Sequence, residues 1–129
     1  MLVLIVDADP DRRRGADRLV QKTGAVAVTA TDPRTAMLLF VRRGPAVTVL
    51  QVDASAACDL GLCRDMKALR AGRRRAVVVV APQESRAAAF ESGCDAFITQ
   101  GTDPLPLQRA VQRLIAAART SDPEVEVVA

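Results

Sequence analysis

Acidic and amide side chains stand where short apolar segments of this chain end. Asp7 and Asp9 follow the first apolar run with Ala8 between them, and Gln51 closes a later run of β-branched residues. A carboxylate at the end of a buried strand can hold a divalent cation or accept a phosphoryl group. A carboxamide cannot accept a phosphoryl group, so the chemistry open to this chain depends on the residue at position 51.

Strand-like and helix-like segments alternate along the chain. Five short apolar runs, several without polar alternation, predict strands covered on both faces: Leu2–Val6, Ala25–Thr29, Val47–Leu50, Ala76–Val80 and Ala96–Ile98. Helical spacing and capping residues predict helices over residues 10–23, 33–43, 60–71, 85–92 and from 103 onward. Because each strand is followed by a helix, we predict a three-layer, doubly wound α/β fold with a five-stranded parallel sheet.

Length and composition predict one domain. The 129 residues suffice for a single core, which Val, Leu, Ile and Ala must build because Trp and Tyr are absent. We assign residues 1–120 to the domain and expect residues 121–129, which are acidic and then apolar, to be a flexible tail. No apolar run approaches the roughly 20 residues that span a bilayer, and the amino terminus lacks the features of a secretory signal. We therefore expect a cytoplasmic protein.

The cysteines do not indicate a disulfide framework or a metal site. Cys58, Cys63 and Cys94 are odd in number and follow no framework spacing, so we expect reduced and mostly buried thiols. The chain has no histidine, so a zinc site would need all three sulfurs and a distant carboxylate. We expect neither a metal nor a cofactor.

Three segments carry a family resemblance. The segment Leu2–Pro10 reads as a first strand followed by an acidic site, and Leu62–Leu69 is similar to a third helix. Gly93–Gln100 is similar to the sequence Gly-Ala-Asp-Asp-Tyr-Leu-Thr-Lys around a fifth strand. In this order the segments resemble the receiver domain of bacterial response regulators over roughly residues 1 to 120. The resemblance implies the flavodoxin-like, CheY-like (βα)5 fold and a role in two-component signal transduction.

The resemblance also implies which chemistry has been lost. The family uses two acidic residues and a phosphoacceptor aspartate to hold magnesium, then a hydroxyl residue and a lysine that contact the phosphoryl group. The matching positions here are Asp7, Ala8, Gln51, Ala81 and Gln100, so only the first acid remains. By this alignment the pocket is degenerate and the chain is a pseudo-receiver.

Asp53 is the alternative phosphoacceptor. It lies two residues after Gln51, and its distance to the following loop glycine fits the family, with Asp7 and Asp9 as the magnesium ligands. The intervals from Asp7 to position 51 and from there to Ala81 fit Gln51 instead. A shift of two residues keeps each side chain on the same face of the strand, so the alternation leaves both assignments open.

The same polar residues also have structural interpretations. Asp7 and Asp9 beside Pro10 could cap a helix, because an anion at a helix amino terminus is stabilised by roughly 0.3 to 1 kcal/mol. Gln51 and Gln100 could form a hydrogen bond to each other across the empty crevice, or they could be solvated.

The function predicted from the sequence is protein binding without phosphorylation or enzymatic activity. By resemblance, the partner or a second copy of the chain would bind the face made by the fourth helix, fifth strand and fifth helix, through Arg86, Phe90, Phe97, Gln108 and Gln112. A second alternative is a sensor of a small anion or nucleotide, although a glycine-rich phosphate loop is absent. The arginine clusters, such as residues 12–14, are typical of solvated helix ends, so nucleic acid is disfavoured as a partner and no membrane contact is expected.

Overall fold

A single parallel sheet forms the centre of the molecule. The computed structural model describes residues 1–52, 60–69, 74–101 and 103–120. The strands lie in the order β2-β1-β3-β4-β5 and all adjacent pairs are parallel. Their bounds are β1 (Leu2–Val6), β2 (Val26–Ala30), β3 (Val47–Gln51), β4 (Ala76–Ala81) and β5 (Ala96–Thr99). The predicted doubly wound α/β fold is therefore confirmed.

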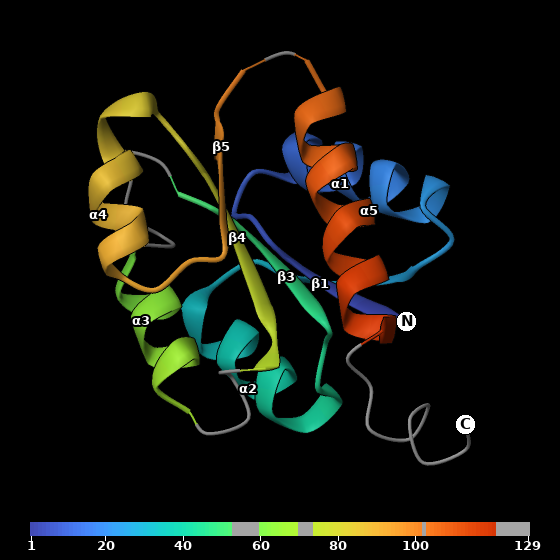
Figure 1. Ribbon diagram of the computed structural model, residues 1–129, viewed down its shortest axis with the longest axis horizontal. Helices are drawn as coiled ribbons and strands as arrows, with labels where there is room; N and C mark the ends of the chain where they lie inside the picture. The colour runs from blue at the N-terminus through green and yellow to red at the C-terminus, as the bar shows by residue number, and fades with distance from the viewer. Residues whose placement is uncertain (53–59, 70–73, 102, 121–129) are drawn as a thin grey trace.

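Helices cover both faces of this sheet. Their bounds are α1 (Pro10–Lys22), α2 (Pro33–Arg43), α3 (Leu60–Ala68), the short 3-10 helix η2 (Gln83–Ser85), α4 (Arg86–Glu91) and α5 (Leu105–Thr120). Helices α1 and α5 lie on one side of the sheet, and α2, α3 and α4 lie on the other (Figure 1). No described helix is long and apolar enough to cross a membrane.

Alternating side chains of the strands build two separate cores. Val3 and Ile5 of β1 pack with the helices α1 and α5, whereas Leu4 and Val6 pack with Phe40 and the other helices. Because every strand contributes to both layers, the central strands are apolar on both faces, as the sequence predicted. Apart from Thr48, which is fully buried within β3, the polar side chains of the central strands lie at the ends of the sheet.

Local capping signals position the helices. Asp32 caps α2 by accepting a hydrogen bond from the backbone N–H of Thr35 at 2.8 Å. Gly44 ends the same helix with φ of 59°, a left-handed conformation that favours glycine. The Arg75 guanidinium donates to the Phe40 carbonyl at 2.9 Å and satisfies one of the last carbonyls of α2.

The third helix is shorter than predicted. The sequence pattern extended it to Ala71 and treated Leu69 as a core residue, but α3 ends at Ala68 and Leu69 is 38% exposed. The backbone N–H of Leu69 donates to Met66 O, three residues back, and this tighter turn ends the helix. The predicted tail, residues 121–129, lies outside the described residues.

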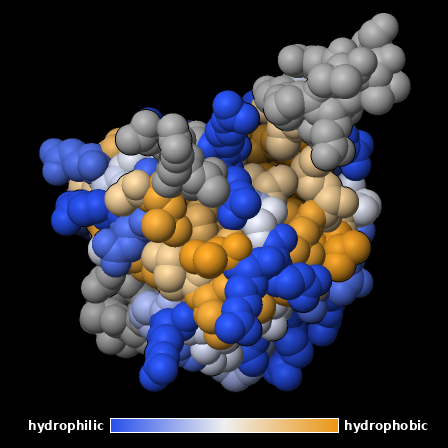
Figure 2. All heavy atoms as spheres, turned by 90° about the horizontal axis from the view of Figure 1, so that it is seen from below, coloured by the Kyte–Doolittle hydropathy of each residue, from blue (hydrophilic) through white to orange (hydrophobic). Residues whose placement is uncertain are grey.

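The two ends of the sheet differ in character. Apolar and hydrophilic side chains mix on the surface at the amino-terminal ends of the strands (Figure 2). Met1, which precedes β1, and Val26, the first residue of β2, are 40% and 61% exposed. The opposite end of the sheet carries the polar residues Asp7, Gln51 and Gln100.

Candidate functional site at the carboxyl ends of the strands

Four of the predicted positions meet at one edge of the sheet. Asp7 follows β1, Gln51 ends β3, Ala81 ends β4 and Gln100 follows β5. The register brings the last two together, because the backbone N–H of Gln100 donates to Ala81 O at 2.8 Å. Parallel strands place ligand-binding residues at this edge in open α/β sheets. Ala81 is fully buried.

Asp7 is fully buried and is paired with an arginine from the next helix. Its Oδ1 accepts a hydrogen bond from Arg12 Nη2 at 2.9 Å, and its Oδ2 accepts one from Arg12 Nε at 3.1 Å. Oδ1 also accepts from the backbone N–H of Asp9 at 2.9 Å, and Arg13 Nη1 donates to the Asp7 carbonyl. This two-pronged geometry is the strong form of an arginine–carboxylate pair. The Asp7 carboxylate therefore has a counter-ion supplied by the chain itself.

Asp9 acts as a helix cap, as one structural interpretation predicted. Its Oδ1 accepts from the backbone N–H groups of Asp11 at 2.9 Å and Arg12 at 3.2 Å, at the start of α1. These two hydrogen bonds, the one from Arg12 first, lower the pKa of Asp9. Because Asp9 caps the helix that carries Arg12, the cap also fixes the backbone position from which the Arg12 side chain extends. Ala8 between the two acids is exposed and has no ligand atom in its side chain.

Gln51 and Gln100 line a shared cavity. This cavity has a volume of about 220 Å³ and lies between α1 and α5, with Arg12 also in its wall. The Gln51 side-chain Oε1 is buried and has no hydrogen-bond partner among the described residues. The hydrogen bond between the two glutamines that the sequence suggested is therefore not formed in the part of the chain that the structure describes.

The other predicted residues of the site fall into two groups. Asp53, the alternative phosphoacceptor, and Cys58 lie outside the described residues. Cys63 and Cys94 are buried free thiols, as predicted, and burial is the main cause that raises the pKa of both. Within the described ranges, no group of three or more His, Cys, Asp or Glu residues could hold a metal ion.

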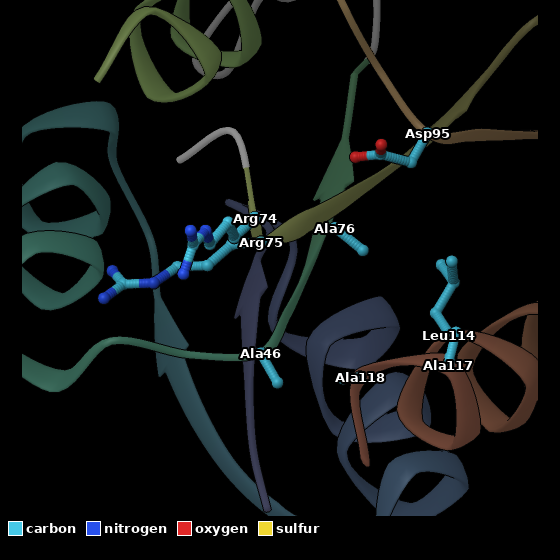
Figure 3. Close-up of a pocket in the computed structure, with 8 residues that line it drawn as sticks. All are labelled: Ala46, Arg74, Arg75, Ala76, Asp95, Leu114, Ala117 and Ala118. Atoms are coloured by element: carbon cyan, nitrogen blue, oxygen red, sulfur yellow. The ribbon is translucent and has the colours of Figure 1, made fainter. Parts of the chain in front are cut away.

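A second cavity lies at the opposite end of the sheet. It has a volume of about 140 Å³ and is lined by residues of β4 and α5 and by residues that directly precede β3, β4 and β5 (Figure 3). Arg74 and Arg75 extend away from Leu114 of α5, and Asp95 approaches from another side (Figure 3). Arg75 already donates to Phe40 O, and Asp95 accepts from the backbone N–H of Val77 at 2.7 Å. This cavity therefore offers few unengaged polar groups to a ligand.

The predicted interaction face carries an exposed aromatic cluster. The Phe90 ring is 44% exposed, and its centroid lies 6.5 Å from that of Phe97 in β5. The Arg86 guanidinium lies 5.4 Å from the Phe90 centroid, a cation–π distance. Phe97 is half-buried and packs against the core. Of the two α5 residues of this face, Gln108 is half-buried and Gln112 is exposed.

Comparison with known proteins identifies the relatives of this chain. No family model matches it. A protein of Leptolyngbya boryana, described as an uncharacterized 14.6 kDa protein in the sodA1 3′ region, is 31% identical over 120 residues, which cover 91% of this chain and 92% of the relative. The chain belongs to the same family as this protein.

Solved structures assign the fold of this family member. The signal receiver domain of a signal transduction histidine kinase from Syntrophus aciditrophicus is 21% identical, covers 94% of each chain and has a TM-score of 0.83. A CheY-like response regulator receiver domain from Methanospirillum hungatei has a TM-score of 0.79 at 16% identity, over 94% of this chain and 98% of that one. A third neighbour is the receiver domain of a Pseudomonas aeruginosa sensor histidine kinase, which has a magnesium ion coordinated in its active site cleft. Its TM-score is 0.78 at 18% identity, over 89% of this chain and 97% of that one. The fold is that of response regulator receiver domains.

Arg12 is a residue of this site that the sequence pattern did not indicate. Residues 12–14 are typical of a solvated arginine cluster, whereas Arg12 binds Asp7 and lines the cavity beside Gln51. The signal available was its place in the first turn of the predicted helix, five residues after Asp7. A long side chain from that turn can reach back to the strand end, but its rotamer is not encoded in any short motif.

Proposed function

We propose that this receiver fold is a pseudo-receiver that binds a protein partner in a signalling pathway and does so without phosphorylation or enzymatic activity. The observation that carries the proposal is the pair of hydrogen bonds between Arg12 and the buried Asp7 carboxylate. A receiver needs a divalent cation at this carboxylate to offset the charge of the incoming phosphoryl group. The Arg12 guanidinium already compensates the charge of the Asp7 carboxylate, and both oxygens of Asp7 are engaged.

The residues around Asp7 support the same conclusion. Ala8 and Ala81 lack polar side-chain atoms, and Gln51 and Gln100 carry neutral amides. By the family resemblance these four positions would hold the second acid, the hydroxyl, the phosphoacceptor and the lysine. At these positions the chain has neither the nucleophilic carboxylate nor the lysine that would receive a phosphoryl group.

The partner would bind the face made by α4, β5 and α5. Strand β5 lies at an edge of the sheet, and beside it Arg86 stacks on the exposed Phe90 ring. Aromatic and arginine side chains dominate the binding energy of many protein interfaces. Leu105 is 48% exposed and stands at helical spacing from Gln108 and Gln112, which extends this surface along α5. The same face could instead pair with a second copy of the chain. We also propose that the protein is cytoplasmic.

The test of the missing chemistry is exposure to acetyl phosphate and magnesium, followed by intact-mass analysis. We expect no added phosphate, because Ala8 and Gln51 supply no carboxylate beside Asp7 and Asp7 itself is bound by Arg12. A phosphate adduct that the Asp53→Asn variant loses would overturn the proposal and establish Asp53 as the acceptor. A catalytically competent receiver treated in parallel verifies the reagents.

The test of the binding face uses matched surface variants. Phe90→Ala and Gln112→Ala should remove partners that co-purify with the wild-type chain, or should shift a dimer to monomer in analytical ultracentrifugation. Arg18→Ala, on the exposed surface of α1, serves as the control and should leave the co-purified partners and the oligomeric state unchanged. Equal losses in all three variants would contradict the assignment of this face.

A further inference from the structure

A groove runs between helices α2 and α3, on the side of the sheet away from α5 (Figure 1). Its cavity has a volume of about 450 Å³ and is lined by two sets of residues: Pro33, Arg34 and Met37 of α2, and Gly61, Leu62 and Asp65 of α3. Helix α3 contacts α2 on one side and α4 on the other, so it separates this groove from the proposed protein-binding face. The groove is therefore a second surface, to which the proposed function assigns no role.

Exposed aliphatic side chains continue the groove along both helices. Leu38 and Val41 of α2 are 48% and 59% exposed, and Leu69, directly after α3, is 38% exposed. Val41 follows Met37 by four residues and Leu69 follows Asp65 by four, so both lie about one helical turn beyond the cavity. Aliphatic side chains that gather beside a hollow and are rimmed by polar residues are typical of a protein-interaction site.

The rim of the groove is basic. Arg34 of α2 and Arg64 of α3 are exposed, and neither side chain forms an ion pair with another residue of the described ranges. Arg42, one turn after Leu38, is exposed as well. Asp65 is the only acid among the described lining residues. Because these arginines outnumber the carboxylate, the rim attracts an acidic partner and would repel the same arginines of a second copy.

The walls of the groove favour a helix as its occupant. Away from their ends, the backbone groups of α2 and α3 are hydrogen-bonded within each helix, so the groove has no strand edge on which an extended peptide could pair. A bound helix satisfies its own backbone and needs only an apolar face toward the groove. Helix α2 has 11 residues, which corresponds to about 16 Å, so the groove accommodates about three turns of a partner helix.

We propose that the groove between α2 and α3 binds an acidic amphipathic helix of a partner protein. The aliphatic stripe of this helix packs on Met37, Leu38 and Val41 of α2. Carboxylates beside the stripe pair with Arg34 and Arg64 on the rim. The groove does not overlap the face made by α4, β5 and α5, so either proposal can fail without the other.

The direct test is a titration with three hydrocarbon-stapled helical peptides of about 12 residues, close to the length of α2. The first carries leucine at positions i, i+3, i+4 and i+7 and glutamate elsewhere. The second has lysine in place of glutamate, and the third has the composition of the first in an order that forms no leucine stripe. NMR spectra of the isotopically labelled chain locate the binding site, and fluorescence anisotropy gives the affinities.

The glutamate peptide should cause saturable shifts at Leu38, Val41 and Gly61. Because it alone has both the stripe and the complementary charge, we expect the other two peptides to bind at least about ten-fold more weakly. Equal affinity for the lysine peptide would overturn the acidic class of partner. Absence of saturable binding, or shifts confined to α4, β5 and α5, would overturn the assignment of the groove.

Two pairs of variants assign the contacts. Leu38→Ala should weaken binding of the glutamate peptide by about ten-fold, whereas Leu105→Ala, at an equally exposed leucine of α5, should not. Arg34→Glu should weaken it by at least as much, whereas Arg18→Glu makes the same change of charge on α1 and should have little effect. Equal losses within either pair would contradict the proposal.

Two further measurements test other occupants of the groove. Analytical ultracentrifugation of wild type and Leu38→Ala should give the same oligomeric state for both, and a dimer lost only in the variant would assign the groove to a second copy. Flotation with phosphatidylglycerol vesicles should show no binding that depends on Leu38. Vesicle binding that Leu38→Ala abolishes would assign the groove to an acidic lipid surface, and either result would overturn the proposal.

Discussion

Asp95 and Val77 exchange two hydrogen bonds. The backbone N–H of Asp95 donates to Val77 O at 2.8 Å, and the backbone N–H of Val77 donates to Asp95 Oδ2 at 2.7 Å. Lys67 of α3 joins them, with its Nζ 3.0 Å from the same Oδ2 and 2.9 Å from Arg75 O. The Asp95 carboxylate thereby holds the start of β5 against β4 and links α3 to both strands. These contacts position the strand that leads to Gln100.

Removing this carboxylate should destabilise the fold. We expect Asp95→Ala to lower the free energy of unfolding by about 1–3 kcal/mol, because the Val77 N–H loses its acceptor in a partly buried setting. The ion pair with Lys67 adds little to this loss, since Asp95 is about one-third exposed. Urea denaturation measures the effect. Asp65→Ala, at an exposed position of α3, is the control, and an equal effect of both substitutions would contradict the assigned role.

Breaking the Asp7–Arg12 pair should also be costly. Arg12→Ala leaves a fully buried carboxylate without its cation, and we expect a loss of up to about 3 kcal/mol. This value is at the lower end of the range for buried pairs because Arg12 is 34% exposed. Thermal and urea unfolding report the change.

The matched control for Arg12 lies two residues further along α1. Arg14 pairs with Asp11, but both side chains are exposed, so Arg14→Ala should change stability by no more than about 0.5 kcal/mol. If Arg12→Ala were equally silent, the guanidinium would not be compensating the buried charge.

The helix caps should make stability depend on pH in the acid range. Backbone N–H donors, from Arg12 first for Asp9 and from Thr35 first for Asp32, lower the pKa of both carboxyls below the ordinary 3.8. A lowered folded-state pKa gives stability that is fully present above the unfolded value and is lost as pH falls through the folded one. We therefore expect the double variant Asp9→Asn/Asp32→Asn to lose less stability than wild type below about pH 4.

Asparagine is the informative substitution because it caps helices about as well as aspartate without titrating in this range. Urea midpoints measured at neutral and acidic pH give the comparison. Asp65→Asn, inside α3, should keep the wild-type acid dependence. A double variant whose acid dependence matches that of wild type would show that the caps do not contribute it.

The buried thiols should react slowly in the native state. Burial is the first cause that raises the pKa of Cys94 to about 11, and it also raises that of Cys63. Because the thiolate is the reactive form, labelling of Cys94 near pH 8 should be slower than for a free cysteine by more than about 100-fold. The measurement uses a Cys58→Ser background and a thiol-specific reagent. Both thiols should label rapidly in denaturant, and a fast native phase would contradict the prediction.

The sequence predicted the order of the elements because burial and capping leave local signals. Apolar runs such as Leu2–Val6 and the sequence Thr31-Asp32-Pro33 mark a strand and a helix start directly. The end of α3 was predicted three residues too late, because the continued apolar spacing through Leu69 did not reveal the turn at Met66 O. Helix ends depend on such single hydrogen bonds, which the pattern does not contain.

The candidate site was predicted in position but not in its contacts. Asp7, Gln51 and Gln100 could be placed together because parallel strands end at one edge. That Arg12 would reach Asp7, and that Gln51 would keep an unpaired oxygen, depends on the packing of α1 and α5 against the sheet. Long-range packing and side-chain rotamers set these contacts, and neither has a periodic signature in the sequence.

The counter-ion of Asp7 is covalently part of the polypeptide. A dissolved cation occupies a site according to its concentration and can be stripped by a chelator, whereas the Arg12 guanidinium is always present at the end of its own side chain. The charge compensation of Asp7 is thereby established during folding. Neither cellular magnesium levels nor a chelator can remove this counter-ion while the chain remains folded.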